Sequence, residues 1–210
     1  MLVKKFKGGY DRNFCYVISE NKQAVIIDPF KDDELINYIK KLEIQYLIST
    51  HSHHDHVEYN EEVKEKTGAI IVLHESTKHY ADKKVKDSEE LSCGNLKIKL
   101  IHTPGHIQDG MCILIEDRLF TGDLLFVGKI GGTGINFPGS DAKQEWESLQ
   151  KIMRLDDSII VYPGHDYGKT PDSTIGKEKK SNPFINCGNF EKFVWIKENW
   201  HEYKKEHNLV

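Results

Sequence analysis

Four histidines and one aspartate lie within six consecutive positions of this chain. They occupy the segment His51-Ser52-His53-His54-Asp55-His56, which Thr50 joins to the apolar run 46–49. Imidazole nitrogens and carboxylate oxygens are ligands of zinc, iron and manganese. A loop that starts where a buried strand ends can point several such side chains at one place. The segment therefore predicts a metal site.

Three more potential ligands follow strand-like runs further along the chain. They are His106 in T-P-G-H, Asp123 in T-G-D and His165 in P-G-H. Together with four residues of the cluster, they place seven potential ligands on four loops, which is enough for two divalent metal ions. Zinc is the expected metal, and the same imidazole and carboxylate set also accepts iron or manganese. Gly105 and Gly164, directly before two of these histidines, are expected to serve the turns that present them.

The composition is that of an ordinary globular protein. The chain has 210 residues, 38% of them hydrophobic, and a formal net charge of -4. We expect a single domain over residues 1–210. The net charge offers no general attraction for nucleic acid or an anionic membrane, although the Lys-rich C-terminal region can carry a local positive patch. No apolar run approaches the roughly 20 residues that span a bilayer. We therefore expect a cytoplasmic protein whose partner is a small-molecule substrate, with its oligomeric state left open.

The four cysteines are widely separated and include no C-x-x-C pair. Neither a disulfide framework nor a cysteine zinc site is indicated. Cys15 and Cys112 lie in strand-like runs and are expected to be buried thiols. Cys187 lies in a polar stretch and is expected to be exposed.

Hydrophobic periodicity predicts an alternation of strands and helices. Asp32 or Asp33 is predicted to cap an amphipathic helix, and Ser76 to cap a short helix that ends near Ala81. Residues 168–188 are predicted to be a loop that leads into one closing helix. The other predicted elements are a hairpin over 14–28, strands at 46–50, 69–73, 96–100, 111–115, 118–121 and 158–162, a helix over 58–66 and a helix capped by Asp141.

This order of elements suggests an α+β fold in which two sheets pack face to face with helices outside. Such a fold is a four-layer αβ/βα sandwich, and the ligand loops are expected to meet at one edge of its two packed sheets. The glycine-rich segment 128–139 follows Asp123 and is expected to border this site. Its glycines form no strand-to-helix phosphate fingerprint, so nucleotide binding is not indicated.

The motifs H-x-H-x-D-H, T-P-G-H, G-D and P-G-H, in this order, resemble those of the metallo-β-lactamase superfamily. The resemblance covers roughly residues 10–170. His54 has no place in the family pattern and is expected to point outward or to orient a neighbour. The resemblance implies two ligand groups and one residue that bridges two metal ions: His51, His53 and His106; Asp55, His56 and His165; and Asp123.

Within the superfamily, the resemblance implies one of two enzyme classes. Glyoxalase II-like thioesterases use hydroxide held between two metal ions to attack the carbonyl of a thioester, which makes Asp55 and Asp123 the expected catalytic residues. Persulfide dioxygenases use one iron, which here would lie on His51, His106 and Asp123. The preferred prediction is a hydrolase of a small thioester or related acyl substrate. The dioxygenase is the alternative, and a non-catalytic metal-binding protein is the second alternative.

Two residues are candidates for substrate binding. Both enzyme classes usually carry a basic residue nine positions after the bridging aspartate, in a G-C-G-[KR] loop that serves thiol-tripeptide substrates, and this chain has Gly132 there. Lys129 can meet an anionic substrate from a shifted position, and Tyr167 can hydrogen-bond substrate. Without that basic residue and the further helical domain of glyoxalase II, glutathione is not the expected thiol.

Overall fold

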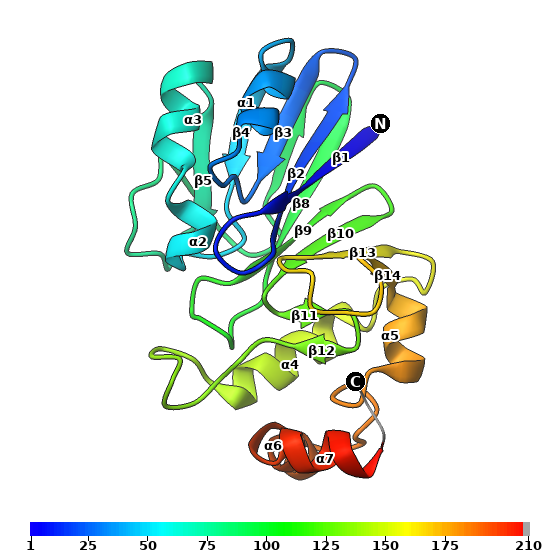
Figure 1. The fold of residues 1–210 in the computed structure, drawn as a ribbon. Coiled ribbons are helices and arrows are strands. Elements are labelled where there is room, and N and C mark those ends of the chain that lie inside the picture. The colour runs from blue at the N-terminus through cyan, green and yellow to red at the C-terminus, as the bar shows by residue number, and fades with distance from the viewer. Residues whose placement is uncertain (208–210) are drawn as a thin grey trace.

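Two six-stranded sheets face each other in the computed structural model, which describes residues 1–207 (Figure 1). In the first sheet the predicted hairpin over residues 14–28 is formed by β2 and β3, and β4, β5 and β6 each run parallel to the preceding strand. Its strands, in spatial order, are β1 (Leu2–Gly8), β2 (Asn13–Glu20), β3 (Gln23–Ile27), β4 (Glu43–Ile48), β5 (Ile70–His74) and β6 (Lys83–Val85).

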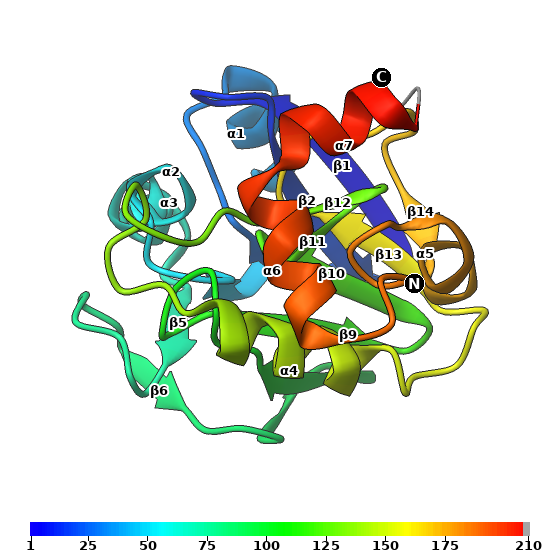
Figure 2. The same cartoon turned by 90° about the horizontal axis from the view of Figure 1, so that it is seen from below.

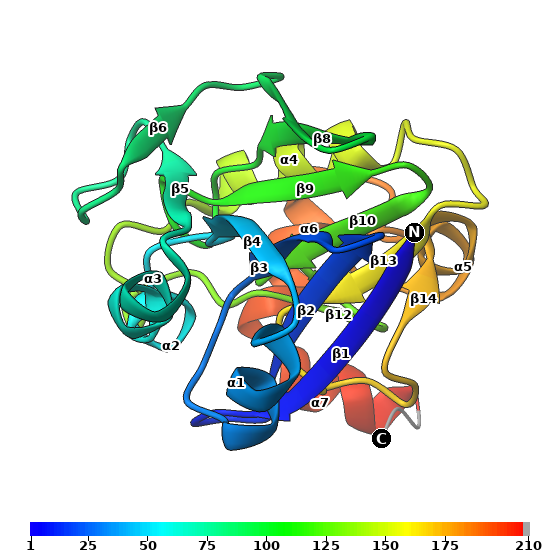
Figure 3. The same ribbon diagram turned by 90° about the horizontal axis from the view of Figure 1, so that it is seen from above.

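The second sheet is antiparallel except where β10 runs parallel to β13. A small hairpin of β11 (Leu125–Phe126) and β12 (Lys129–Ile130) follows β10. Figure 3 shows strands of the two sheets lying next to each other. In spatial order the strands of the second sheet are β14 (Ser173–Thr174), β13 (Ile160–Pro163), β10 (Arg118–Gly122), β9 (Met111–Ile115), β8 (Leu96–His102) and β7 (Glu90–Cys93).

Helices cover the outer face of each sheet and complete the predicted four-layer sandwich. Leu35 of α1 and Val63 of α3 belong to the apolar cluster on the outer side of the first sheet, and Leu149 of α4 and Phe193 of α6 belong to the cluster on the outer side of the second. Helix α6 lies against α4 (Figure 2). Within the described residues, no helix has the length and apolar character needed to cross a bilayer. The helices are α1 (Asp33–Ile39), α2 (His54–Val57), α3 (Asn60–Thr67), α4 (Ala142–Ile152), α5 (Ile175–Ser181), α6 (Phe190–Glu198) and α7 (Trp200–Glu206).

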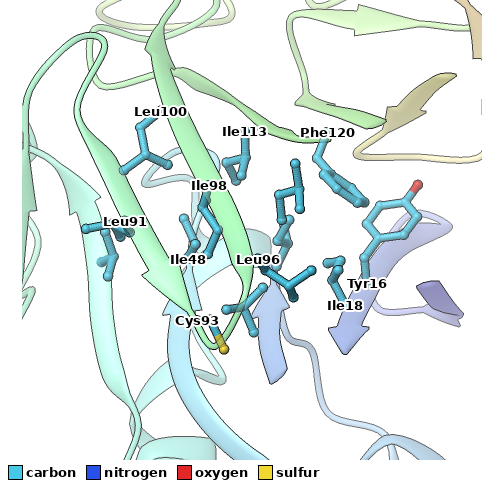
Figure 4. Packing of buried hydrophobic residues seen from close by; sticks show 14 of the residues in the cluster. Tyr16, Ile18, Ile48, Leu91, Cys93, Leu96, Ile98, Leu100, Ile113 and Phe120 are labelled. Carbon is cyan, nitrogen blue, oxygen red and sulfur yellow. The ribbon is translucent and has the colours of Figure 1, made fainter. Parts of the chain in front are cut away.

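The core between the sheets is built by strands with alternating apolar residues. Leu96, Ile98 and Leu100 of β8 are buried in this core (Figure 4). Lys97 and Lys99 between them are exposed. Burying a leucine or isoleucine side chain contributes about 1.5–3 kcal/mol relative to leaving it exposed. The half-buried strand predicted from this alternation is therefore confirmed.

Hydrogen bonds join the two sheets at the edge where β4, β10 and β13 end. The backbone N–H of Met111 donates to the carbonyl of Thr50 at 2.8 Å, and the N–H of Phe14 donates to the carbonyl of Gly164 at 2.8 Å. Each bond joins a residue at the start of a strand in one sheet to a residue just beyond the end of a strand in the other sheet. The loops that follow these strands are therefore held next to one another.

The predicted helix from Ser76 to Ala81 is wrong. These residues form a turn and an irregular segment between β5 and β6. The hydroxyl of Ser76 donates to the carbonyl of Gln108 at 3.1 Å and contacts Nδ1 of His74 at 2.8 Å, so it does not cap a helix. The residues that follow Ser76 also supply no apolar stripe with helical spacing.

Residues 168–188 contain β14 and α5, so the prediction of a loop there is also wrong. The hydroxyl of Thr174 caps α5 by accepting from the N–H of Lys177, and Ile175 anchors the helix in the core. The closing helix is two helices, α6 and α7, which meet at Asn199. The predicted domain over residues 1–210 includes 208–210, which lie outside the described residues.

The cysteines largely follow their sequence environment. Cys15 and Cys112 are buried as predicted, and all four thiols are free. Cys187 is only partly exposed, which corrects the prediction of an exposed thiol. Its Sγ lies 3.0 Å from the carbonyl oxygen of Phe184.

Candidate metal centre

Three histidines point ring nitrogens at one another next to the end of β4. His51 and His53 lie in the loop between β4 and α2, and His106 lies in the loop between β8 and β9. The Nδ1 atom of His53 is 3.0 Å from Nε2 of His51 and 3.0 Å from Nε2 of His106. We call these three residues the first group; their ligand atoms are close enough to hold one metal ion.

A second group lies beside the first. Asp55 and His56 belong to α2, and His165 follows β13. The Nε2 atoms of His56 and His165 are 3.2 Å apart, and Oδ2 of Asp55 is 3.5 Å from each of them. Both histidines are buried. These three residues, the second group, could also hold one metal ion.

Asp123 lies between the two groups, at the end of β10. Its Oδ2 is 3.7 Å from Nε2 of His106 and 3.3 Å from Nε2 of His165, and its Oδ1 is 3.5 Å from Nε2 of His56. Oδ1 is buried and has no hydrogen-bond partner among the described residues. The carboxylate is thus placed where one residue can serve both groups.

In two of the rings, a hydrogen bond made by the nitrogen that points away from the centre determines which nitrogen faces it. Nδ1 of His106 donates to the carbonyl of Gly132 at 2.7 Å, and Nδ1 of His165 donates to the carbonyl of Asp11 at 2.8 Å. A carbonyl oxygen only accepts, so the proton of each neutral ring is on Nδ1 and the lone pair is on Nε2. Partners of this kind orient the histidines of metal sites.

The two groups differ in the pKa values of their histidines. Burial lowers the pKa of His51, His53 and His106, which keeps these rings neutral. Burial also opposes the charge on His56, but nearby carboxylates outweigh it and raise its pKa to about 9. The pKa of His165 is raised as well, against burial, chiefly by Asp123.

These residues fit divalent metal ions. Lone pairs of neutral rings about 3 Å apart repel one another, and an unpartnered buried carboxylate oxygen is costly, unless a cation lies among them. Nitrogen and oxygen donors without any thiolate suit zinc, iron or manganese. The chemistry of this donor set therefore supports the predicted metal site.

Asp28, which the sequence analysis missed, supports both His56 and the loop after β4. Its Oδ1 accepts from the N–H of Thr50 at 2.7 Å, and its Oδ2 accepts from the Thr50 hydroxyl at 2.7 Å and contacts Nδ1 of His56 at 2.9 Å. The carboxylate is buried, and its backbone has a positive φ of 49°. A carboxylate directly after the apolar run 24–27 was a signal that could have identified it.

Asn13 is a second residue that the sequence analysis missed. It is buried at the start of β2, and its Nδ2 donates to Oδ2 of Asp55 at 2.8 Å. Its own Oδ1 accepts from the N–H of Asp11 at 3.1 Å. Asn13 therefore fixes Asp55 from the start of β2, more than forty positions away in the sequence. No feature of its sequence neighbourhood points to this role.

Two glycines that directly precede candidate ligands allow close packing around the centre. Gly105 has a φ of 146°, and a Cβ atom there would lie 2.2 Å from Cα of Glu145. A Cβ atom on Gly164 would lie 2.5 Å from Oδ1 of Asp123. A larger residue at either position would displace the adjacent histidine or the central carboxylate.

The other predicted site residues lie at the margin of the centre. His54 is on the outer face of α2, where it is 74% exposed and pairs with Glu58 at 3.1 Å. The ring of Tyr167 stacks on His165, and its hydroxyl donates to Oδ2 of Asp11. The ammonium group of Lys129 donates to the carbonyl of Tyr167 at 2.8 Å. His54 thus points outward as expected, and Tyr167 touches a candidate ligand.

A model of the metallo-beta-lactamase superfamily matches residues 8–165, which include every candidate ligand. The chain belongs to this superfamily. It is 34% identical over 169 residues to a hydroxyacylglutathione hydrolase from Francisella tularensis subsp. novicida, a match that covers 74% of this chain and 64% of that protein. The chain thus spans less than two thirds of the length of this relative.

Two other superfamily members match a larger share of both chains. The probable polyketide biosynthesis zinc-dependent hydrolase BaeB from Bacillus velezensis is 30% identical and covers 87% of this chain and 85% of that protein. The crystal structure of ETHE1 from Myxococcus xanthus is 31% identical, with a TM-score of 0.88, and covers 95% of this chain and 91% of that one. The α+β sandwich with the site at its edge is therefore confirmed.

Proposed function

We propose that this protein is a metal-dependent hydrolase that cleaves a small thioester or a related acyl compound. The observation that carries the proposal is the pair of complete ligand groups that share Asp123. A structural zinc site needs four ligands and closes them around one ion, whereas seven ligands around two positions suit metal-assisted hydrolysis. This argues against the non-catalytic alternative. Zinc is the metal we propose, with iron or manganese as alternatives.

The side chains around the centre have distinct parts in this proposal. Two bound divalent ions would lower the pKa of a water molecule and polarise an acyl carbonyl. Asp123 would serve both groups, because its Oδ2 lies near His106 of the first group as well as His165 of the second. Asp55 is partly exposed, with Oδ2 held by Asn13, so it can orient a water at the opening of the site and accept its proton.

Lys129 and Tyr167 are the proposed substrate-binding residues. Tyr167 extends the wall of the site outward from His165, since the two rings are stacked with centroids 4.8 Å apart. An ammonium group has three donors, and only one from Lys129 is used by the carbonyl of Tyr167. The remaining donors can meet an anionic part of the substrate. The partner of the protein is then a small molecule.

A mononuclear iron persulfide dioxygenase is the second candidate. It is favoured by the similarity to ETHE1 over 95% of this chain. His51, His106 and Asp123 would provide two imidazoles and one carboxylate for the iron. In that case the second group would not be needed for activity.

Metal analysis combined with two assays tests the proposal. The hydrolase predicts about two metal ions per chain and hydrolysis of acyl thioesters that is lost after chelation and restored by zinc. The dioxygenase predicts one iron per chain and oxygen uptake with a persulfide. A His51→Ala variant is the control for contaminating activity. Oxygen uptake without thioester hydrolysis would overturn the hydrolase.

A further inference from the structure

Two cavities lie on either side of β12, next to the metal centre. The smaller, about 480 Å³, lies between the glycine-rich segment and α6. The larger, about 690 Å³, lies between the β11–β12 hairpin, the segment after His165, and α5. Lys129 and Trp200 line both of them. Volumes of this size are typical of sites for small organic ligands.

The larger cavity, which we call the lysine cavity, lies next to the second group, from which Tyr167 separates it. Tyr167 lines this cavity with Gly168, Lys169 and Thr170, and its ring is stacked on that of His165. A substrate whose reacting carbonyl lies at the metal centre can therefore extend past Tyr167 into it. This step rests on the proposed function, because it takes the metal centre as the reacting end.

The wall of the lysine cavity is positively charged. Lys129, Lys169 and Lys177 line it. Burial lowers the pKa of Lys129, and the nearby cations Lys204 and Arg12 lower it further. Across residues 1–207, neither Lys169 nor Lys177 is within 4.0 Å of a carboxylate oxygen. Clustered cations without carboxylate partners repel one another, which favours an anionic ligand.

The one carboxylate that lines the cavity offsets only one of its three lysine charges. Glu178 is 1% exposed. Its oxygens accept from the N–H of Gly128, the hydroxyl of Ser173 and the side-chain amide of Asn182. The carboxylate is therefore buried behind the wall, already saturated with donors. The three lysines therefore leave the lysine cavity with a net positive charge, although the chain as a whole carries a net charge of -4.

We propose that the lysine cavity binds a phosphate-bearing thiol, so that the substrate is an acyl thioester of a pantetheine phosphate such as coenzyme A. Lysine ammonium groups are compact charges that bind phosphate well, and three of them spread over one cavity match an extended polyanion. Glutathione carries two carboxylates and one ammonium group, so its net charge is smaller. The same cavity therefore discriminates against it.

The test is binding of thiol-blocked compounds to the protein as purified. S-methyl coenzyme A, S-methyl 4′-phosphopantetheine and S-methylglutathione have no free thiol to ligate a metal, and calorimetry gives a Kd for each. We expect S-methyl coenzyme A to bind at least ten times more tightly than S-methylglutathione. Equal affinities for the two phosphate compounds would assign recognition to the single phosphate that they share. Tighter binding of S-methyl coenzyme A than of S-methyl 4′-phosphopantetheine would assign recognition to the nucleotide phosphates as well.

Matched double variants locate the binding. Lys169→Ala with Lys177→Ala should weaken S-methyl coenzyme A at least tenfold. Lys78→Ala with Lys180→Ala removes the same charge, and Lys180 is on the same helix α5 but outside the cavity, so this control should retain binding. Equal loss in both pairs, or no preference over S-methylglutathione, would overturn the proposal.

The same measurements separate this inference from the proposed function. Tight, Lys169-dependent binding without hydrolysis of any acyl thioester would retain the lysine cavity and reject the hydrolase. Hydrolysis of thioesters with no dependence on Lys169 and Lys177 would retain the hydrolase and reject the phosphate-bearing thiol.

Discussion

The two ligand groups of the metal centre are built differently, although they lie side by side. The rings of the first group are kept neutral by burial, and His106 is held by a backbone carbonyl. His56 of the second group is surrounded by carboxylates and has a pKa of about 9. The first group presents lone pairs to a metal ion without first losing a proton, whereas the second must release one.

The groups also differ in where their support comes from. The first is supported by the glycine-rich segment and, behind it, by α4 and α6. The second depends on the loop between β1 and β2, through Asn13 and the carbonyl of Asp11. One metal position can therefore be weakened without the other. Variants of the ligands and of the residues that support them can test whether the two metal positions are independent.

The largest effect is expected where the two groups share a residue or where the first group is broken. We expect His51→Ala and Asp123→Ala each to reduce metal-dependent hydrolysis to the rate of chelated protein, because each loses a ligand that no neighbour replaces. Steady-state kinetics and metal content measure this. Substantial zinc-stimulated activity in either variant would refute the ligand assignment.

A second variant tests the scaffold behind the first group. Lys197 of α6 pairs with the buried carboxylate of Glu145, and its Nζ donates to the carbonyl of Gly131 at 2.9 Å. Removing one partner of a buried ion pair costs roughly 3–5 kcal/mol. We expect Lys197→Met to lower the free energy of unfolding by about this amount at pH 8. Urea unfolding of chelated protein measures it, with Lys192→Met on the same helix as the control.

The loss in free energy of unfolding caused by Lys197→Met should be larger at pH 8 than at pH 5. Burial raises the pKa of Glu145 to about 7 against the effect of Lys197, so without that lysine the pKa lies higher still. The folded protein then holds this proton more tightly than the unfolded chain, whose glutamate has an ordinary pKa of 4.5. The stability that the protonated Glu145 carboxyl contributes therefore falls as the pH rises above 4.5. A loss as large at pH 5 as at pH 8 would contradict the burial argument.

A smaller and selective effect is expected from Asn13→Ala. This variant removes the donor to Asp55, and loss of a hydrogen-bond partner of a metal ligand typically costs 10–100-fold, on the order of 1–3 kcal/mol, in metal affinity. We expect the second metal to be lost on dialysis while the first is retained. Metal content per chain measures this, and Asn21→Ala in the turn between β2 and β3 is the control. Equal loss of both metals would show that the two groups are not independent.

The sequence predicted the candidate ligands because their geometry is set locally. His51 to His56 share one loop, and each of the others follows a strand end, so spacing and family pattern were sufficient. The layers of the fold followed from hydrophobic periodicity, as in β8. Both kinds of signal extend over only a few residues.

The supporting residues were not predicted because they come from distant segments. Asn13 meets Asp55, and Asp28 meets His56, through pairings that no local pattern encodes. Helix α5 was missed because its polar residues lack an apolar stripe, and its anchors are the Thr174 cap and buried Ile175. The lysine cavity likewise joins three separate segments, so its charge was visible only as scattered lysines.

The smallest effect is expected from the one histidine of the cluster that faces away from both groups. His54 is 74% exposed and pairs with Glu58. Exposed pairs of this kind contribute about 0–1 kcal/mol, so His54→Ala should retain most of the hydrolytic rate and both metal ions. Metal content and kcat/KM measure this beside His56→Ala, two positions away on the same helix, which should lose the second metal. Loss of metal from His54→Ala would mean that the ligands of α2 are not those of the second group.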